Sequence, residues 1–160
     1  QAVARRATAF GMKIIYHNRK ALPTNIEAKY NARYVSLDEL FSDSDVLTLN
    51  APATPDTYHF IGKEELQQMK PSAILINTSR GSLVDETALA EALSKKEILA
   101  AGLDVFENEP KITSALLELD NVVLTPHAGT QTIEGRLDMQ KEVAQNILGF
   151  FSGKEISKVN

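Results

Sequence analysis

Three side chains, Arg80, Glu109 and His127, are of the types that could act together on a small anionic carbonyl compound. An arginine can hold a carboxylate through two parallel hydrogen bonds from its planar guanidinium. A histidine can act as a general acid or base near neutral pH, and a neighbouring carboxylate favours its protonated form. Each residue also has a plainer interpretation, because an Arg, Glu or His in a loop is commonly a solvated surface residue.

The elements predicted around these residues make the chemical interpretation stronger. Short apolar, partly β-branched runs that predict strands occur at residues 13–17, 46–50, 73–78, 100–105 and 121–126. Apolar residues at helical spacing occur between them, at residues 37–41, 63–69 and 86–93. Strands with consecutive apolar residues, alternating with helices, are typical of a parallel sheet covered on both faces. The sequence therefore predicts an α/β fold built on a doubly wound parallel sheet.

Ligands of such sheets bind beyond the carboxyl ends of the strands, so the residues after each predicted strand are the candidates for chemistry. These segments are residues 17–19, 50–52, 78–81, 104–109 and 125–127. Arg80, Glu109 and His127 then follow successive strands, and together they form the set of groups that carbonyl reduction requires.

Two other kinds of site are disfavoured by the sequence pattern. The three histidines, His17, His59 and His127, are far apart and show no spacing typical of metal ligands, so no metal site is expected. Ser79 and Ser82 lie near Arg80, but no GxSxG motif surrounds them, which argues against a serine hydrolase.

The composition of the chain argues against nucleic-acid and membrane partners. The 160 residues carry a formal net charge of −4 and their basic residues are scattered, which argues against a nucleic-acid partner. No apolar run has the length of a membrane span and no secretory leader is recognised, so we expect no membrane partner. The absence of cysteine rules out disulfides and thiolate chemistry and is compatible with a reducing compartment. A cytoplasmic protein is the expectation.

The two ends of the chain are informative about domain organisation. Residues 1–10 contain good helix formers without a preceding capping residue, so the chain is expected to start inside a helix; an ordinary N-terminal helix of a trimmed protein is the alternative. An amphipathic helix is predicted from residue 130 to about residue 151. We expect residues 1–130 to form a partial dinucleotide-binding domain, and residues 131–160 to form a helix and tail that reach toward a substrate domain outside the chain.

The motifs NTSRG, GLDVFENEP and LTPHAGT, which carry Arg80, Glu109 and His127, resemble those of the D-isomer-specific 2-hydroxyacid dehydrogenases. The similarity is greatest to the glyoxylate and hydroxypyruvate reductase branch, covers essentially the whole chain and includes the spacing of the three motifs. It implies a Rossmann-like NAD(P)-binding domain whose first strand and glycine-rich loop lie upstream of Gln1. It also implies a homodimer, and a chain that is inactive without those parts and the substrate domain.

The resemblance assigns roles to individual residues. His127 would donate a proton to the substrate carbonyl, Glu109 would be its hydrogen-bonded partner, and Arg80 would anchor the 2-oxo acid, with glyoxylate or hydroxypyruvate as the expected substrate. The implied cofactor contacts are Ala51, Pro52, Thr57, Thr78, Ser79, Arg80, Asp104, His127 and Gly129. From the residues alone, Asp104 could equally cap the turn that follows its strand.

The end of the first predicted strand bears on the choice of nicotinamide cofactor. NAD-preferring enzymes usually place an acidic side chain there for the adenine ribose, whereas this chain has Asn18 followed by Arg19 and Lys20. The two cations could pair with the 2′-phosphate of NADP, so NADP is the expected cofactor and NAD the alternative. The alternative for Arg19 and Lys20 is that they are ordinary surface cations.

A different class of function is compatible with the same motifs. Transcriptional corepressors that sense dinucleotides share this fold and can retain all three residues, so a non-enzymatic sensor stays open. A formate dehydrogenase is disfavoured, because that branch pairs its histidine with Gln and this chain has Glu109.

Overall fold

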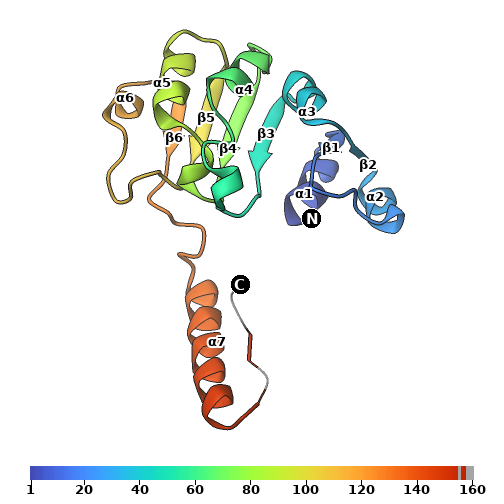
Figure 1. The fold of residues 1–160 in the computed structure, drawn as a ribbon, viewed down its shortest axis with the longest axis vertical. Helices are drawn as coiled ribbons and strands as arrows, with labels where there is room; N and C mark the ends of the chain where they lie inside the picture. The colour runs from blue at the N-terminus through green and yellow to red at the C-terminus, as the bar shows by residue number, and fades with distance from the viewer. Residues whose placement is uncertain (155, 158–160) are drawn as a thin grey trace. The chain divides into compact units, whose positions relative to one another are not determined.

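The computed structural model describes residues 1–154, 156 and 157, and Figure 1 shows the chain as a ribbon. It contains two compact units, Gln1–Pro126 and His127–Asn160. The boundary between the units lies after residue 126, four residues before the domain boundary that the sequence suggests.

All strands of the first unit pair in parallel, which confirms the predicted α/β fold with a parallel sheet. One pair joins β1 (Ile14–Tyr16) to β2 (Ala32–Tyr34). The larger sheet has the order β3-β4-β5-β6, with bounds Val46–Leu49, Ile74–Asn77, Ala100–Leu103 and Val122–Leu124. The larger sheet follows chain order from β3 to β6, and β1 and β2 form a pair separate from it.

Burial alternates along the larger sheet, so that one face is covered and the other is half exposed. In β4, Leu75 and Asn77 are buried, whereas Ile74 and Ile76 are only partly buried. The buried face packs on a core that includes Leu66 of α4 (Lys63–Gln68) and Leu89 of α5 (Glu86–Ser94). Among the described residues, one face of the larger sheet is therefore fully covered, as predicted, and the other face is only partly buried.

The remaining helices of the first unit are short. They are α1 (Ala2–Ala9), α2 (Thr24–Tyr30), α3 (Leu37–Asp43) and α6 (Ser114–Leu117), with single 3-10 turns at η1 (Pro55–Thr57) and η2 (Gly81–Leu83). The helix expected at residues 1–10 is confirmed as α1, which has no side-chain cap at Gln1. Sequence reasoning does not find α2, β2 or α6. β2 and α6 have only three and four residues, and α2 is mostly polar, with the sequence TNIEAKY.

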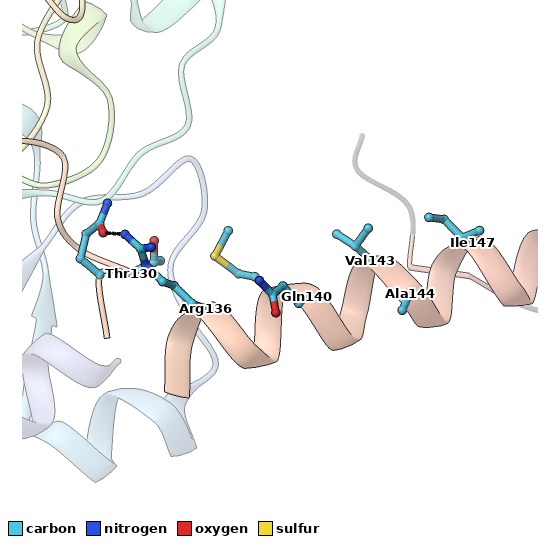
Figure 2. A pocket seen from close by; sticks show the side chains of 8 residues that line it. Thr130, Arg136, Gln140, Val143, Ala144 and Ile147 are labelled. Atoms are coloured by element: carbon cyan, nitrogen blue, oxygen red, sulfur yellow. Dashed lines mark hydrogen bonds between the residues drawn. The ribbon is translucent and has the colours of Figure 1, made fainter. Parts of the chain in front are cut away.

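The second unit consists mainly of α7 (Ile133–Phe151), which confirms the predicted C-terminal helix. The Thr132 side chain caps it by accepting a hydrogen bond from the Gly135 amide at 3.0 Å. Many of its apolar side chains are exposed, and Met139, Val143 and Ile147 line a shallow groove along one side (Figure 2). Large exposed apolar patches usually mark interfaces, and the contact of this helix with another domain stays a prediction. None of the described helices combines the length and the hydropathy needed to cross a bilayer.

Candidate active site

The candidate residues of the first unit lie along one edge of the larger sheet. The cross-strand register aligns Leu49, Asn77, Leu103 and Leu124, which are the last residues of the four strands. The Asp104 amide donates to the Asn77 carbonyl at 2.9 Å, and the Thr125 amide donates to the Leu103 carbonyl at 2.9 Å. The segments that follow β3, β4, β5 and β6 therefore start side by side, as the sequence predicts for a ligand-binding edge.

The turn that carries Arg80 is shaped by Asn77, which sequence reasoning missed. The Asn77 side chain is fully buried, donates to the Arg80 carbonyl at 2.9 Å and accepts from the Ser79 amide at 3.1 Å. The Ser79 hydroxyl donates to the Ala51 carbonyl at 2.5 Å, which joins this turn to the segment after β3. The Arg80 side chain itself is exposed and donates to the Ser79 carbonyl at 2.7 Å. The backbone at Arg80 is thus fixed while its guanidinium faces solvent.

Gly81 lets the Arg80 turn approach the loop that carries Glu109. A Cβ atom at Gly81 would lie 1.9 Å from the carbonyl carbon and 2.1 Å from the carbonyl oxygen of Phe106. A glycine in a turn commonly serves to adopt a positive φ, but Gly81 does not, because the described glycines with positive φ are Gly11 and Gly153. The reason for glycine at position 81 is close backbone packing.

Gly81→Ala is therefore expected to destabilise the first unit by about 1–3 kcal/mol or more, because overpacking forces the backbone to shift. Denaturant unfolding of the variant measures this loss. Gly62→Ala is the matched control, since a Cβ there would meet its nearest atoms at 3.4 and 3.7 Å, which is ordinary contact. Equal stability of the two variants would contradict the proposed packing role of Gly81.

Asp104 and Glu109 lie in the loop after β5. The Asp104 carboxylate, only 8% exposed, accepts a hydrogen bond from the Thr125 hydroxyl at 2.5 Å, which ties the end of β5 to the end of β6. One carboxylate oxygen of Glu109 accepts from the Phe106 amide at 3.0 Å, and Glu109 lies on the exposed surface of the loop. The Asp104 carboxylate therefore bridges two strand ends rather than capping only its own turn.

His127 follows β6 and is the first residue of the second unit. Its backbone is left-handed, with φ of 49°, and its side chain is exposed. Left-handed backbone is uncommon for residues other than glycine, although His adopts it more readily than most, and such residues are often found at functional sites. The convergence of His127 with Glu109 and Arg80 stays a prediction.

A cluster of polar residues beside this edge was not found from the sequence. His59, with φ of 50°, lies with its Nε2 2.6 Å from a Glu107 carboxylate oxygen and its Nδ1 3.9 Å from Asp85. The Tyr58 hydroxyl donates to the same Glu107 oxygen at 3.0 Å, and this bond to a carboxylate raises the pKa of Tyr58. No local sequence pattern identifies this cluster, because His59 and Glu107 lie 48 residues apart in the chain. The cluster links the loop after β3 to the loop after β5.

The loop after β1 holds Asn18, Arg19 and Lys20, all exposed. The Tyr34 hydroxyl donates to the Asn18 carbonyl at 3.0 Å. At the far end of the loop, the Tyr16 hydroxyl accepts from the Leu22 amide at 2.7 Å and donates to Glu27 at 2.6 Å. Partial burial and the Glu27 carboxylate raise the pKa of Tyr16. The loop is therefore held at both ends while its cations face solvent.

The remaining predicted cofactor contacts include one residue that is bonded within its own loop and two residues that are exposed. Thr57 uses its hydroxyl within its own loop, donating to the Pro52 carbonyl at 2.8 Å and accepting from the Thr54 amide at 2.8 Å. Thr78 is exposed at the end of β4, and Gly129 is exposed in the second unit. No group of three metal-ligating side chains occurs within the described residues.

The donor set at this edge fits a nicotinamide dinucleotide. The loop after β1 offers exposed cations to a phosphate or ribose, and the exposed Thr78 follows β4 on a turn that the Ser79–Ala51 hydrogen bond holds in place. The glycine-rich loop that would hold the pyrophosphate is not among these residues. The residues after β1 and β3–β6 therefore stay the predicted contacts of such a cofactor.

Comparison with known proteins agrees with this geometry. The chain is 50% identical over 154 residues to a glyoxylate reductase of Thermococcus litoralis, covering 96% of this chain and 46% of that protein. The crystal structure of a glyoxylate reductase from Paecilomyes thermophila superimposes with a TM-score of 0.91 at 45% identity, covering 98% of this chain and 48% of that one. An NADPH-dependent glyoxylate/hydroxypyruvate reductase from Sinorhizobium meliloti, solved with NADP and malonate, gives a TM-score of 0.88 at 38% identity, covering 94% and 46%.

The chain thus spans about half the length of the relatives that it matches. Its residues 1–129 match the family model described as the NAD binding domain of D-isomer specific 2-hydroxyacid dehydrogenases. On this match and on the fold it shares with solved members, the chain belongs to the family of D-isomer specific 2-hydroxyacid dehydrogenases.

Proposed function

We propose that the protein to which this chain belongs reduces a small 2-oxo acid to the corresponding D-2-hydroxy acid with a reduced nicotinamide cofactor. One observation supports this most: Arg80, Glu109 and His127 follow three strands of one parallel sheet, and Gly81 packs the Arg80 turn directly on the Glu109 loop. These observations support the proposal that an anion-binding group, a carboxylate and a histidine act together.

Each residue has a role that its chemistry allows. The exposed guanidinium of Arg80 binds the substrate carboxylate in two parallel hydrogen bonds and so fixes the 2-oxo group. His127 donates a proton to the carbonyl oxygen as it becomes a hydroxyl, and Glu109 stabilises the protonated imidazole and orients it. A bound reduced nicotinamide supplies the hydride to the substrate carbon.

Glyoxylate or hydroxypyruvate is the proposed substrate, supported by the names of the Thermococcus litoralis and Sinorhizobium meliloti relatives. The test is to produce the complete protein and follow oxidation of NADH and NADPH with a panel of 2-oxo acids. We expect turnover with one of these two acids. A dinucleotide-binding protein that reduces none of them would overturn the proposal and favour the corepressor-like sensor.

The loop after β1 supports NADP rather than NAD as the cofactor, and the solved Sinorhizobium meliloti relative holds NADP. Arg19 and Lys20 are exposed on a loop fixed at both ends, and the acidic residue that would repel a 2′-phosphate is replaced by Asn18. NADPH is therefore expected to give the higher kcat/KM.

Arg19→Ala should lower kcat/KM with NADPH by about tenfold, the loss expected for one charge-assisted hydrogen bond, and leave NADH almost unaffected. Lys29→Ala, which removes an exposed cation from α2, is the matched control and should change neither value. A wild-type preference for NADH, or no loss of NADPH efficiency in Arg19→Ala, would reject this account of the loop.

We also propose a homodimer in the cytoplasm. The absence of cysteine supports a reducing compartment. Size-exclusion chromatography with light scattering on the complete protein measures the first point, and a monomer at micromolar concentration would contradict it.

A further inference from the structure

We propose that Glu86 is a positioning residue that holds the loop carrying Glu109 in its working conformation. The inference rests on the proposed function, because it gives Glu109 its role beside His127. It assigns a task to a buried carboxylate that lies outside the candidate catalytic and cofactor-binding residues.

Glu86 is one of the few buried charged residues in the described chain. It is the first residue of α5 and only 3% exposed. Its helix does not need it as a cap, because the Asp85 side chain already accepts from the Thr87 and Ala88 amides, each at 3.0 Å. Burying a carboxylate is costly unless hydrogen bonds satisfy it. The hydrogen-bond partners of Glu86 therefore indicate its structural role.

Both oxygens of Glu86 bind the loop between β5 and α6. Oε1 accepts from the Glu107 amide at 2.6 Å, and Oε2 accepts from the Thr113 hydroxyl at 2.5 Å. These bonds fall on either side of Glu109, so the loop is held at two points that bracket the predicted partner of His127. Hydrogen bonds to an ionised carboxylate are about twice as strong as neutral ones.

Other contacts leave this segment little freedom. Glu109 itself accepts from the Phe106 amide at 3.0 Å, and Gly81 packs on the peptide between Phe106 and Glu107. The Glu107 side chain is held by His59 at 2.6 Å. Among these anchors, Glu86 is the one that binds both ends of the segment, and its own position is fixed by burial in the first turn of a helix.

A group that orients a catalytic partner without touching substrate should affect kcat more than KM, because it alters the geometry of proton transfer and leaves the carboxylate-binding Arg80 in place. In the complete protein, Glu86→Ala is expected to lower kcat by about 10- to 100-fold, the range seen when supporting partners of metal ligands are removed. KM for the 2-oxo acid should stay within about threefold of the wild-type value.

Two further variants separate positioning from stability. Glu86→Gln keeps an acceptor for the Glu107 amide and can donate to the Thr113 oxygen, so it should restore most of kcat. Thr113→Val removes one of the two bonds and should give an intermediate loss of kcat. Glu91→Ala is the control: Glu91 lies on the same helix, is exposed and pairs with Lys95, so kcat should not change.

Activities are normalised to the folded fraction, measured by circular dichroism. A Glu86→Ala protein that is folded and has the wild-type kcat would overturn the assignment, as would Glu86→Gln as slow as Glu86→Ala. If Glu86→Ala does not fold, the same comparison is made with Thr113→Val, and a wild-type kcat in that variant would overturn it. Absence of turnover by the wild-type protein would overturn the proposed function as well, whereas wild-type turnover with unaffected variants would overturn only the role of Glu86.

Discussion

Replacement of His127 by alanine in the complete protein is expected to lower kcat by about 10²- to 10⁴-fold, the usual contribution of a general acid. Dinucleotide affinity should change by no more than about threefold, because a proton donor acts mainly in the transition state. Steady-state kinetics with the 2-oxo acid and fluorescence titration with the cofactor measure the two quantities.

The left-handed backbone at His127 calls for a second variant. Asparagine tolerates positive φ as histidine does but transfers no proton near neutral pH, so His127→Asn tests the side-chain chemistry without straining the turn. It should be as slow as His127→Ala. A His127→Asn protein with near wild-type kcat would remove the imidazole from the mechanism.

Replacement of Arg80 by alanine is expected to reduce kcat/KM for the 2-oxo acid by about 10- to 100-fold, from the loss of hydrogen bonds to a charged group. Much of this loss should be in KM, since the guanidinium holds the carboxylate in ground state and transition state alike. Arg80→Lys should recover only part of it, because a lysine keeps the charge but lacks the planar fork.

Arg33→Ala is the matched control for Arg80. Arg33 is an exposed arginine of β2 that pairs with Glu39 at 2.5 Å, and an exposed pair contributes little to stability. Its removal should leave KM unchanged. An Arg80→Ala protein with wild-type KM and kcat would mean that another group binds the substrate carboxylate.

The sequence predicts the elements of this fold wherever the apolar pattern is long enough. The runs at 46–50, 73–78, 100–105 and 121–126 became β3 to β6 because consecutive apolar residues favour buried parallel strands. β2 was missed because its three residues include the exposed Arg33. The strand order could not be read from the pattern, since pairing depends on contacts between segments distant in sequence.

In the candidate site, too, local sequence patterns locate some residues, whereas contacts between distant segments determine the others. Residues at strand ends, such as Arg80 and Asp104, could be located from the sequence because the carboxyl edge of a parallel sheet is where ligands bind. The residues that support them could not. From the sequence alone, Asn77 is a polar residue at the end of a strand, and Glu86 is an ordinary acidic residue in the first turn of a helix. Their roles come from burial and from partners in other loops, which no local pattern encodes.

Gly81 has a role that the local sequence does not reveal. A glycine in a turn commonly serves to adopt a positive φ. The structure gives Gly81 another reason, a Phe106 carbonyl carbon that would lie 1.9 Å from any Cβ. Close approach of two loops depends on tertiary packing, so only the folded chain reveals it.

The measurement that tests the central claim most directly is isotope transfer in the complete protein. The reaction is run with nicotinamide cofactor carrying deuterium at its reducing position and with glyoxylate or hydroxypyruvate, and the product is analysed by NMR. The account predicts a 2-hydroxy acid with deuterium bonded to carbon 2, in the D configuration where that carbon is a stereocentre, and almost none of it with the His127→Asn protein. An unlabelled or L-configured product, or a protein that binds the cofactor and returns both compounds unchanged, would contradict it.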